Sequence, residues 1–185
     1  MKKLIIIVVT LLLAAVAPAV LAADETPATA TAVIRDASGR EAGKATFTTL
    51  PSGEVQIKVA VSGFDHGAGG NHGIHIHAIG LCTTPDFASA GGHFNPTTKK
   101  HGLENPEGPH SGDLTNIQFY PNGSAVYEAV TDHVTLGTGA SSLFDADGSA
   151  IVIHAGPDDG MTDPSGNSGA RIACGVIVPD KAASN

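Results

Sequence analysis

The sequence predicts an all-β domain in which eight short strands form an antiparallel sandwich or barrel. Three observations carry this prediction. Short runs rich in valine, isoleucine and threonine recur after residue 30, which is typical of strands. Turn-forming clusters separate the runs, in a chain with 23 glycines and 11 prolines. No stretch after residue 30 shows the 3.6-residue hydrophobic period of a helix.

The predicted strands form two groups of four on either side of a long irregular stretch. They are expected at residues 30–35, 44–49, 54–61, 73–79, 116–120, 124–131, 150–154 and 172–178. The sequence Pro121-Asn122-Gly123 predicts a hairpin turn between the fifth and sixth strands. Two connections, residues 80–115 and 155–171, exceed the roughly 15 residues of ordinary loops, and such loops usually carry function or are disordered.

The first 22 residues predict a secretory signal peptide. Lys2 and Lys3 precede an apolar run, and Val20-Leu21-Ala22 suits a signal peptidase that cleaves before Ala23. An uncleaved membrane anchor is the alternative, because about 19 apolar residues are just enough to span a bilayer. Cleavage would leave a short linker, one domain and a tail, at residues 23–30, 31–179 and 180–185. We expect an exported protein, periplasmic or extracellular, without stable membrane insertion after cleavage.

The charge balance argues against nucleic acid as a partner. The chain has 10 lysines and arginines against 18 aspartates and glutamates, a net charge of −8. Removal of the signal peptide takes away two lysines and makes the net charge −10. No cluster of basic residues offers a surface to a phosphate backbone, so we expect no nucleic-acid binding.

The two cysteines, Cys82 and Cys174, predict one disulfide, because exported proteins meet an oxidising compartment. The bond would close a loop of about 92 residues, for which chain entropy allows roughly 4–5 kcal/mol of stabilisation. Two free thiols that act as metal ligands or nucleophiles are the alternative. Neither cysteine belongs to a Cys-x-x-Cys pair.

Several polar residues lie on predicted strands or at their ends. His75 and His77 are two residues apart in one strand, so they project from the same face and can bind a metal together. Two solvated histidines on a polar face are the alternative. His154 ends another apolar strand, and Asp158 follows it. Arg171 directly precedes the last predicted strand, and its fixed charge and planar guanidinium suit an anion, with a surface salt bridge as the alternative.

The first long loop contains a second group of candidate metal ligands. His93, His101, His110 and Asp113 follow one another at spacings of eight, nine and three residues. Three imidazoles and a carboxylate fit a tetrahedral zinc site. Bound metal would also hold together a loop that has little core of its own. Because Asp113 completes the set, no position is left for an activated water, which argues against a zinc hydrolase.

Taken together and in order, these motifs resemble the copper,zinc superoxide dismutases, over about residues 30–179. The motifs are Gly-Ile-His-Ile-His (73–77), Gly-Gly-His-Phe-Asn-Pro (91–96), Lys-His-Gly (100–102), His-Ser-Gly-Asp-Leu (110–114), Ile-Val-Ile-His (151–154) and Gly-Asn-Ser-Gly-Ala-Arg-Ile-Ala-Cys-Gly-Val (166–176). The resemblance implies an eight-stranded antiparallel Greek-key β-barrel, immunoglobulin-like, with two long functional loops. It also implies copper on His75, His77, His93 and His154, and zinc on His93, His101, His110 and Asp113, with His93 shared by both metals.

The resemblance further implies a reaction, the conversion of superoxide to O₂ and H₂O₂ by alternating Cu(II) and Cu(I), as protection against oxidative stress outside the cytoplasm. His93 would take part in proton transfer, and Asp158 would link a copper ligand to a zinc ligand. Arg171 would face the copper opening, and Cys82–Cys174 would be the internal disulfide. A non-catalytic copper- or zinc-binding or copper-buffering protein on the same fold is the alternative function.

Some features depart from the animal and plant cytosolic relatives. Between Gly160 and Arg171 the second long loop has one charged residue, Asp163. Attraction of superoxide would then rest on Arg171 and the metals, so we expect a rate that depends weakly on salt. Cys82 also comes early, five residues after His77, so the eukaryotic dimer contact cannot be carried over and a homodimer is left open. His72 is expected to be structural, and His66 and His133 have no assigned role.

Overall fold

The structure is a computed structural model that describes residues 28–64 and 69–180. The predicted signal peptide, most of the linker after it, most of the predicted tail and His66 lie outside the described residues. Within the described ranges, no helix has the length and apolar character needed to cross a membrane.

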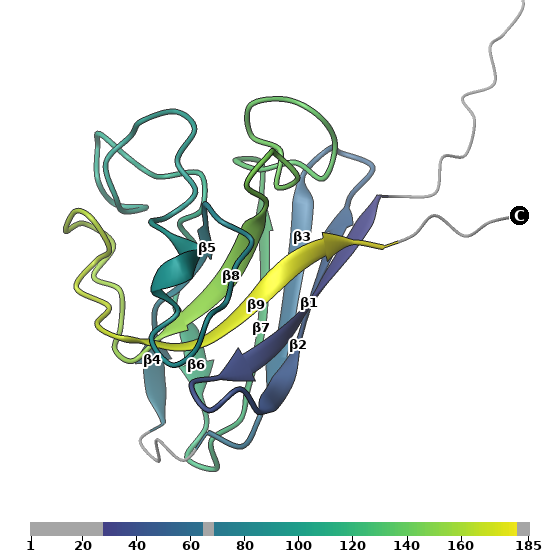
Figure 1. The fold of residues 1–185 in the computed structure, drawn as a ribbon. Coiled ribbons are helices and arrows are strands. Elements are labelled where there is room, and N and C mark those ends of the chain that lie inside the picture. The colour runs from purple at the N-terminus through teal and green to yellow at the C-terminus, as the bar shows by residue number, and fades with distance from the viewer. Residues whose placement is uncertain (1–27, 65–68, 181–185) are drawn as a thin grey trace, which may run out of the picture.

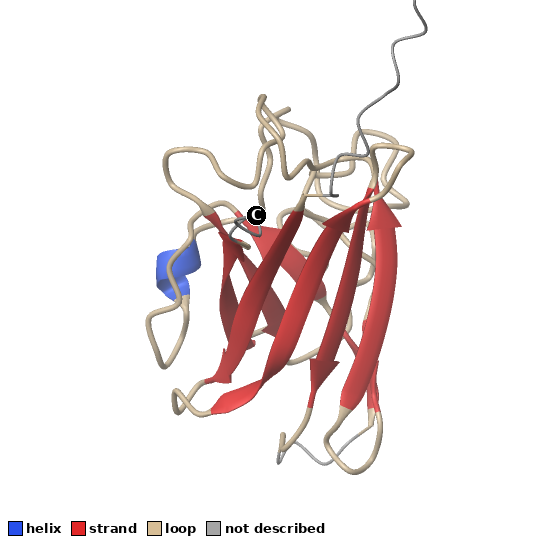
Figure 2. Cartoon of the chain, turned by 90° about the vertical axis from the view of Figure 1, so that its right-hand side faces the viewer, coloured by secondary structure: helices blue, strands red, loops and turns tan. Residues whose placement is uncertain are grey.

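The described residues form one nine-stranded sheet that curves into a nearly closed barrel (Figures 1 and 2). Every pair of neighbouring strands is antiparallel. The spatial order of the strands is β4-β6-β7-β3-β2-β1-β9-β8-β5. The strands are β1 (Thr29–Asp36), β2 (Glu41–Thr49), β3 (Val55–Val61), β4 (Gly70–His72), β5 (Ile74–His77), β6 (Ile117–Phe119), β7 (Ala125–Thr131), β8 (Ser149–His154) and β9 (Arg171–Pro179), and a short 3₁₀ turn, η1, covers Ala88–Ala90.

The antiparallel β-barrel is confirmed, but the prediction of eight strands is one short for the described residues. The segment predicted at residues 73–79 is β5, and a short strand, β4, precedes it. Only Gly73 separates the two, yet they lie at opposite ends of the sheet order. The chain itself therefore joins the two sheet edges at Gly73. A Cβ there would lie 2.7 Å from the Cβ of Ser168, so only glycine fits this close approach.

The hairpin predicted at Pro121-Asn122-Gly123 is confirmed. It joins β6 to β7, and the N–H of Tyr120 donates to the carbonyl of Ser124 at 2.8 Å. Gly123 has a φ of +73°, and a Cβ at this position would collide with the carbonyl oxygen of Phe64. Both facts explain why glycine ends the turn.

The hydrophobic core lies inside the barrel, and it determines where the long loops can pack. In β3 the buried residues Val55, Ile57, Val59 and Val61 alternate with more exposed ones, as expected of a strand with one face on the core. By contrast, β5 and β8 are buried along their whole length. Their outer faces are covered by the long connections 78–116 and 155–170, which lie on the same side of the barrel in Figure 1.

Candidate metal centre

Four histidine side chains converge beneath the two long loops, and all four are buried. Ile74 and Ile76 point into the barrel core, so His75 and His77 on the same strand point outward, under the loops. His154 comes from the neighbouring strand β8, where Ile151 and Ile153 point into the core and His154 therefore projects from the outer face. The remaining member, His93, lies in the first long loop and pairs with His77 in an isolated β-bridge.

In each of these rings the structure leaves one nitrogen without a hydrogen-bond partner. His77 Nδ1 lies 3.0 Å from the carbonyl oxygen of Gly91, and His154 Nδ1 lies 3.1 Å from that of Gly169. His75 Nε2 lies 2.6 Å from a carboxylate oxygen of Asp158. The nitrogens left over are Nδ1 of His75 and Nε2 of His77, His93 and His154, all buried.

These four unpartnered nitrogens lie within 4.8 Å of one another. A buried polar atom almost always has a partner, so four of them gathered at one point call for an explanation. Four imidazole nitrogens fit a tetragonal metal such as Cu(II), which prefers this donor set.

A second set surrounds Asp113, whose carboxylate oxygens have separate partners. Oδ2 accepts hydrogen bonds from the backbone N–H groups of Gly102 at 2.8 Å and His110 at 2.9 Å. Oδ1 lies 2.8 Å from His93 Nδ1, 3.0 Å from His101 Nδ1 and 3.3 Å from His110 Nδ1. Ligand atoms around a tetrahedral zinc ion are about 3.3 Å apart, so this group has the size and the donor types of a zinc site.

One ring belongs to both sets. His93 turns Nδ1 toward Asp113 and leaves Nε2 for the first set. Its ring centroid is 4.0 Å from that of His75 and 5.1 Å from that of His101. The two candidate metals would therefore be joined through a single imidazole.

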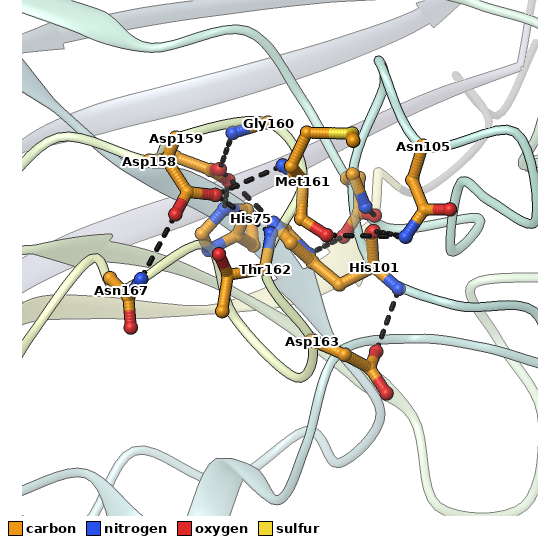
Figure 3. A network of polar contacts seen from close by, with 12 residues as sticks. His75, His101, Asn105, Asp158, Asp159, Gly160, Met161, Thr162, Asp163 and Asn167 are labelled. Atoms are coloured by element: carbon orange, nitrogen blue, oxygen red, sulfur yellow. Dashed lines mark hydrogen bonds and ion pairs between the residues drawn. The ribbon is translucent and has the colours of Figure 1, made fainter.

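Asp158 connects the two sets from outside. One of its oxygens lies 2.6 Å from His75 Nε2 and the other 3.0 Å from His101 Nε2. Figure 3 shows Asp158 between these two rings. Asn116 holds the backbone of Asp158 in both directions: its side-chain N–H donates to the Asp158 carbonyl at 2.8 Å, and its oxygen accepts from the Asp158 N–H at 2.8 Å. Such outer contacts fix the tautomer and orientation of metal-binding histidines.

The environment sets the protonation of the first set. Burial lowers the pKa of His75 to about 3, of His77 to about 2 and of His154 to about 4, and it also lowers the pKa of His93. Since removing charge from water is costly, these rings are neutral at pH 7. Each therefore offers a lone pair to a metal.

In the second set, hydrogen bonds outweigh burial in determining which groups are charged. Burial disfavours charge on His101, but hydrogen bonds to Asp113 and Asp158 outweigh it and raise its pKa to about 9. Burial likewise opposes the charge of the two carboxylates, yet hydrogen bonds from His101 and other donors keep the pKa of both well below the usual range. Asp113 and Asp158 are therefore ionised. A zinc ion would replace the proton that His101 otherwise carries between them.

Arg171 lies at the edge of the four-histidine set, and its guanidinium is held by backbone. Nη1 donates to the carbonyl oxygen of Phe87 at 2.7 Å, and Nη2 donates to that of Gly91 at 2.6 Å. The Gly91 carbonyl also faces His77 Nδ1, so one oxygen orients both residues. Among the described residues no carboxylate forms an ion pair with Arg171, and its hydrogen-bond partners are backbone carbonyls instead.

The loop that holds Arg171 is anchored by the disulfide. Cys82 and Cys174 are bonded, as predicted, with their Cα atoms 5.7 Å apart. The buried ring of Phe87 packs with these cysteines in a small cluster on the outer face of β8, together with Ala90, Ala150 and Val152. An open pocket beside Arg171 is lined in part by Asp86, Gly92 and Ala170.

The remaining histidines of the described residues lie outside both sets. His72 Nδ1 is 2.8 Å from the carbonyl oxygen of His154, and its ring contacts Phe119, so its environment is structural, as expected. His133 is partly exposed and lies 3.4 Å from Asp132. The sequence does not single out Asn116 or the carbonyls of Phe87, Gly91 and Gly169. The carbonyls carry no residue-type signal, because every residue has one.

Two sets of four potential metal ligands that share His93, placed on the outside of an antiparallel β-barrel, have the arrangement expected of a dinuclear metalloprotein. Comparison with known families agrees with this class. The profile described as copper/zinc superoxide dismutase matches residues 41–177, and the chain belongs to that family.

Individual relatives support the same membership. The chain is 49% identical to copper-zinc superoxide dismutase 1 of Aquifex aeolicus over 140 residues, 75% of this chain and 81% of the relative. It is 46% identical to the copper-zinc superoxide dismutase of Caulobacter vibrioides over 151 residues, 80% and 84% of the two chains. Among solved structures, a superoxide dismutase-like protein from Bacillus subtilis matches with a TM-score of 0.72 and 36% identity, over 80% of this chain and 97% of the other.

The clock protein EA4 has the same fold, with a TM-score of 0.68 and 33% identity over 85% of this chain and 98% of that one. The resemblance noted from the motifs is confirmed. The family is one of oxidoreductases, with copper and zinc as its metals and superoxide as its substrate.

Proposed function

We propose that this protein is an exported superoxide dismutase in which His75, His77, His93 and His154 hold copper and His93, His101, His110 and Asp113 hold zinc. The observation that carries the proposal is the set of four buried, unpartnered imidazole nitrogens beside Arg171. The donor types decide the metals, since four imidazoles suit copper, whereas three imidazoles and a carboxylate in a compact group suit zinc.

The reaction converts two superoxide anions and two protons into one O₂ and one H₂O₂. When bound, copper supplies the one-electron chemistry, since it accepts an electron from one superoxide and donates an electron to the next. Arg171 attracts the anion through a charge that persists at any physiological pH. Two of its five N–H groups bind carbonyls, so the others are free to contact superoxide.

His93 is the residue proposed to handle a proton. Its Nδ1 stays with the zinc set, while Nε2 can hold a proton when it is not bound to copper. Asp158 accepts from Nε2 of both His75 and His101, which directs the Nδ1 atom of each ring toward its metal once zinc has replaced the proton on His101. The protein thus contributes anion attraction, ligand orientation and a proton site.

Export is the second part of the proposal. It is supported by the basic start, apolar run and small residues of the first 22 positions, and by the disulfide, which persists in oxidising compartments. The expected mature domain covers residues 31–179 after a linker at 23–30. Mass spectrometry of protein from the extracytoplasmic fraction should give a chain that begins at Ala23. A full-length chain held in the membrane fraction would favour the membrane anchor instead. Separately, sedimentation velocity will show whether the mature chain forms a homodimer.

Asp158→Asn is expected to weaken the binding of both metals by about 10- to 100-fold, because one of the two oxygens that accept from the imidazoles becomes an NH₂ group, which cannot accept. Chelator competition measures both affinities. Asp159→Asn is the matched control, since Asp159 bonds only within its own loop, to Met161, Thr162 and Asn167. Equal affinities for Asp158→Asn and wild type would contradict the linking role.

Arg171→Gln is expected to lower kcat/KM for superoxide by about tenfold, because local attraction of an anion can change association rates by 10-fold or more. Metal content should not change, since Arg171 contacts no metal-facing atom. Pulse radiolysis at several ionic strengths gives the rate and its salt dependence, which we expect to be weak in the wild type. Arg40→Gln, in the β1–β2 turn, removes the same charge and should leave the rate unaltered. A steep salt dependence of the wild-type rate would refute the proposal that attraction of superoxide is local to Arg171 and the metals.

A further inference from the structure

All four polar groups of His101 have a partner in the structure. Its ring nitrogens Nδ1 and Nε2 each lie 3.0 Å from a carboxylate oxygen, of Asp113 and Asp158 respectively. Its backbone N–H donates to Asp163 Oδ1 at 2.8 Å, and its carbonyl accepts from Asn105 Nδ2 at 2.9 Å. This histidine is therefore held through its backbone as well as through its ring.

Asp163 reaches His101 from a distant part of the chain. It lies in the second long loop, 62 residues further along the sequence. In Figure 3 it meets the backbone nitrogen of His101, while Asp158 approaches the ring. The same Oδ1 atom is 3.8 Å from His110 Nε2, so one carboxylate lies against two members of the proposed zinc set.

The two loops are fitted closely around this contact. The N–H of Glu104 donates to the carbonyl of Gly160 at 3.0 Å, and Asn105 Nδ2 also donates to the carbonyl of Met161 at 3.1 Å. A Cβ at Gly102 would collide with the Gly160 carbonyl. Asp163 thus acts from a loop whose position relative to His101 is fixed by backbone contacts.

Of the contacts that Asp163 makes, the hydrogen bond from the His101 backbone N–H is the strongest. A carboxylate that accepts from an N–H forms a charge-assisted bond, which is shorter and stronger than a neutral one. Asp163 also lies 3.6 Å from Lys100 Nζ, but both side chains are about half exposed, and such ion pairs contribute little. The strongest contact between Asp163 and the proposed zinc set is therefore the hydrogen bond to the backbone of His101.

We propose that Asp163 is a positioning residue for the zinc set: by holding the backbone of His101 from the opposite loop, it places the His101 ring for zinc. The inference rests on the proposed assignment of zinc to His93, His101, His110 and Asp113. Asp163 is the one charged residue between Gly160 and Arg171. Its proposed role couples the zinc-binding loop to the loop that leads to Arg171.

The test measures zinc affinity of the mature protein by chelator competition, together with the visible absorption of the cobalt(II)-substituted zinc site. Asp163→Ala should bind zinc about tenfold more weakly and shift the cobalt bands, because outer partners of metal ligands have effects of this size. Asp163→Asn keeps an oxygen that can accept from the His101 N–H, so it should restore both readouts nearly to wild type. Copper binding to the four-histidine set should change less than zinc binding.

Two further variants separate this role from charge and from general loop integrity. Lys100→Gln removes the ion pair but not the hydrogen bond, and Asp159→Ala removes a carboxylate of the same loop that does not touch His101. Both should keep wild-type zinc affinity. The proposal is overturned if Asp163→Ala behaves as wild type, if Asp163→Asn is as weak as the alanine variant, or if Asp159→Ala weakens zinc equally. A wild-type protein that binds no zinc would instead contradict the proposed function.

Discussion

His75→Ala is expected to lose copper and to lower the rate of superoxide decay by more than about 100-fold. Outer partners of metal ligands already change affinity or activity by 10–100-fold, and removal of a ligand itself should exceed this. His75 contributes the one Nδ1 atom among the four converging nitrogens, on a strand that is buried on both faces. Metal analysis and pulse radiolysis on the same sample measure both effects.

His133→Ala is the matched control for this variant. It removes a partly exposed imidazole that belongs to neither ligand set and lies 3.4 Å from Asp132, so copper content and decay rate should stay at wild-type values. Zinc should largely remain in His75→Ala, because the Asp113 set does not use His75. Intact dismutation in His75→Ala would show that copper is assigned to the wrong residues. Wild-type protein with full copper but no dismutation would favour the non-catalytic metal-binding alternative.

Replacement of both cysteines by serine should lower the free energy of unfolding by about 4–5 kcal/mol. The reason is the sequence separation of 92 residues, since a longer closed loop restricts the unfolded chain more strongly. A second effect is expected on the reaction. Without the bond, the cluster around Phe87 loosens, and the Phe87 carbonyl no longer fixes Arg171. Urea unfolding measures the first effect and kcat/KM the second.

Treatment with a reductant distinguishes this mechanism from the effect of the substitutions themselves. Reduced wild type should approach the Cys82→Ser/Cys174→Ser variant in stability, and the variant should not respond to reductant. If the variant unfolds at the same urea concentration as oxidised wild type, the disulfide contributes no stability. If its kcat/KM is unchanged, Arg171 is positioned without help from the bond.

The strands could be predicted because their signals are local. A run rich in valine and isoleucine predicts a strand at 54–61, which is β3 at Val55–Val61, and the turn residues predict the β6–β7 hairpin. The separation of β4 from β5 could not be predicted in the same way. It depends on which distant strands pair on either side of Gly73, and pairing between distant segments leaves little trace in a short window of sequence.

The candidate ligands could also be identified from the sequence, because histidines and an aspartate at characteristic spacings are visible as residue types. The structure brings all seven of them together, with His93 between the two sets. The role of Asn116, by contrast, could not be anticipated. Its amide binds the backbone of Asp158, which is 42 residues away in the sequence. Nothing in the sequence around an asparagine before a short strand indicates such a contact.

Residue type and spacing are therefore enough to predict most of the strands, the candidate metal ligands and the disulfide. Only the tertiary structure decided which ring nitrogens are free, how the His93 ring is shared, and that carbonyls of Phe87 and Gly91 rather than a carboxylate hold Arg171. These facts depend on the orientation of backbone groups from separate loops. Every residue carries the same carbonyl, so folding alone decides which of them meets a given side chain.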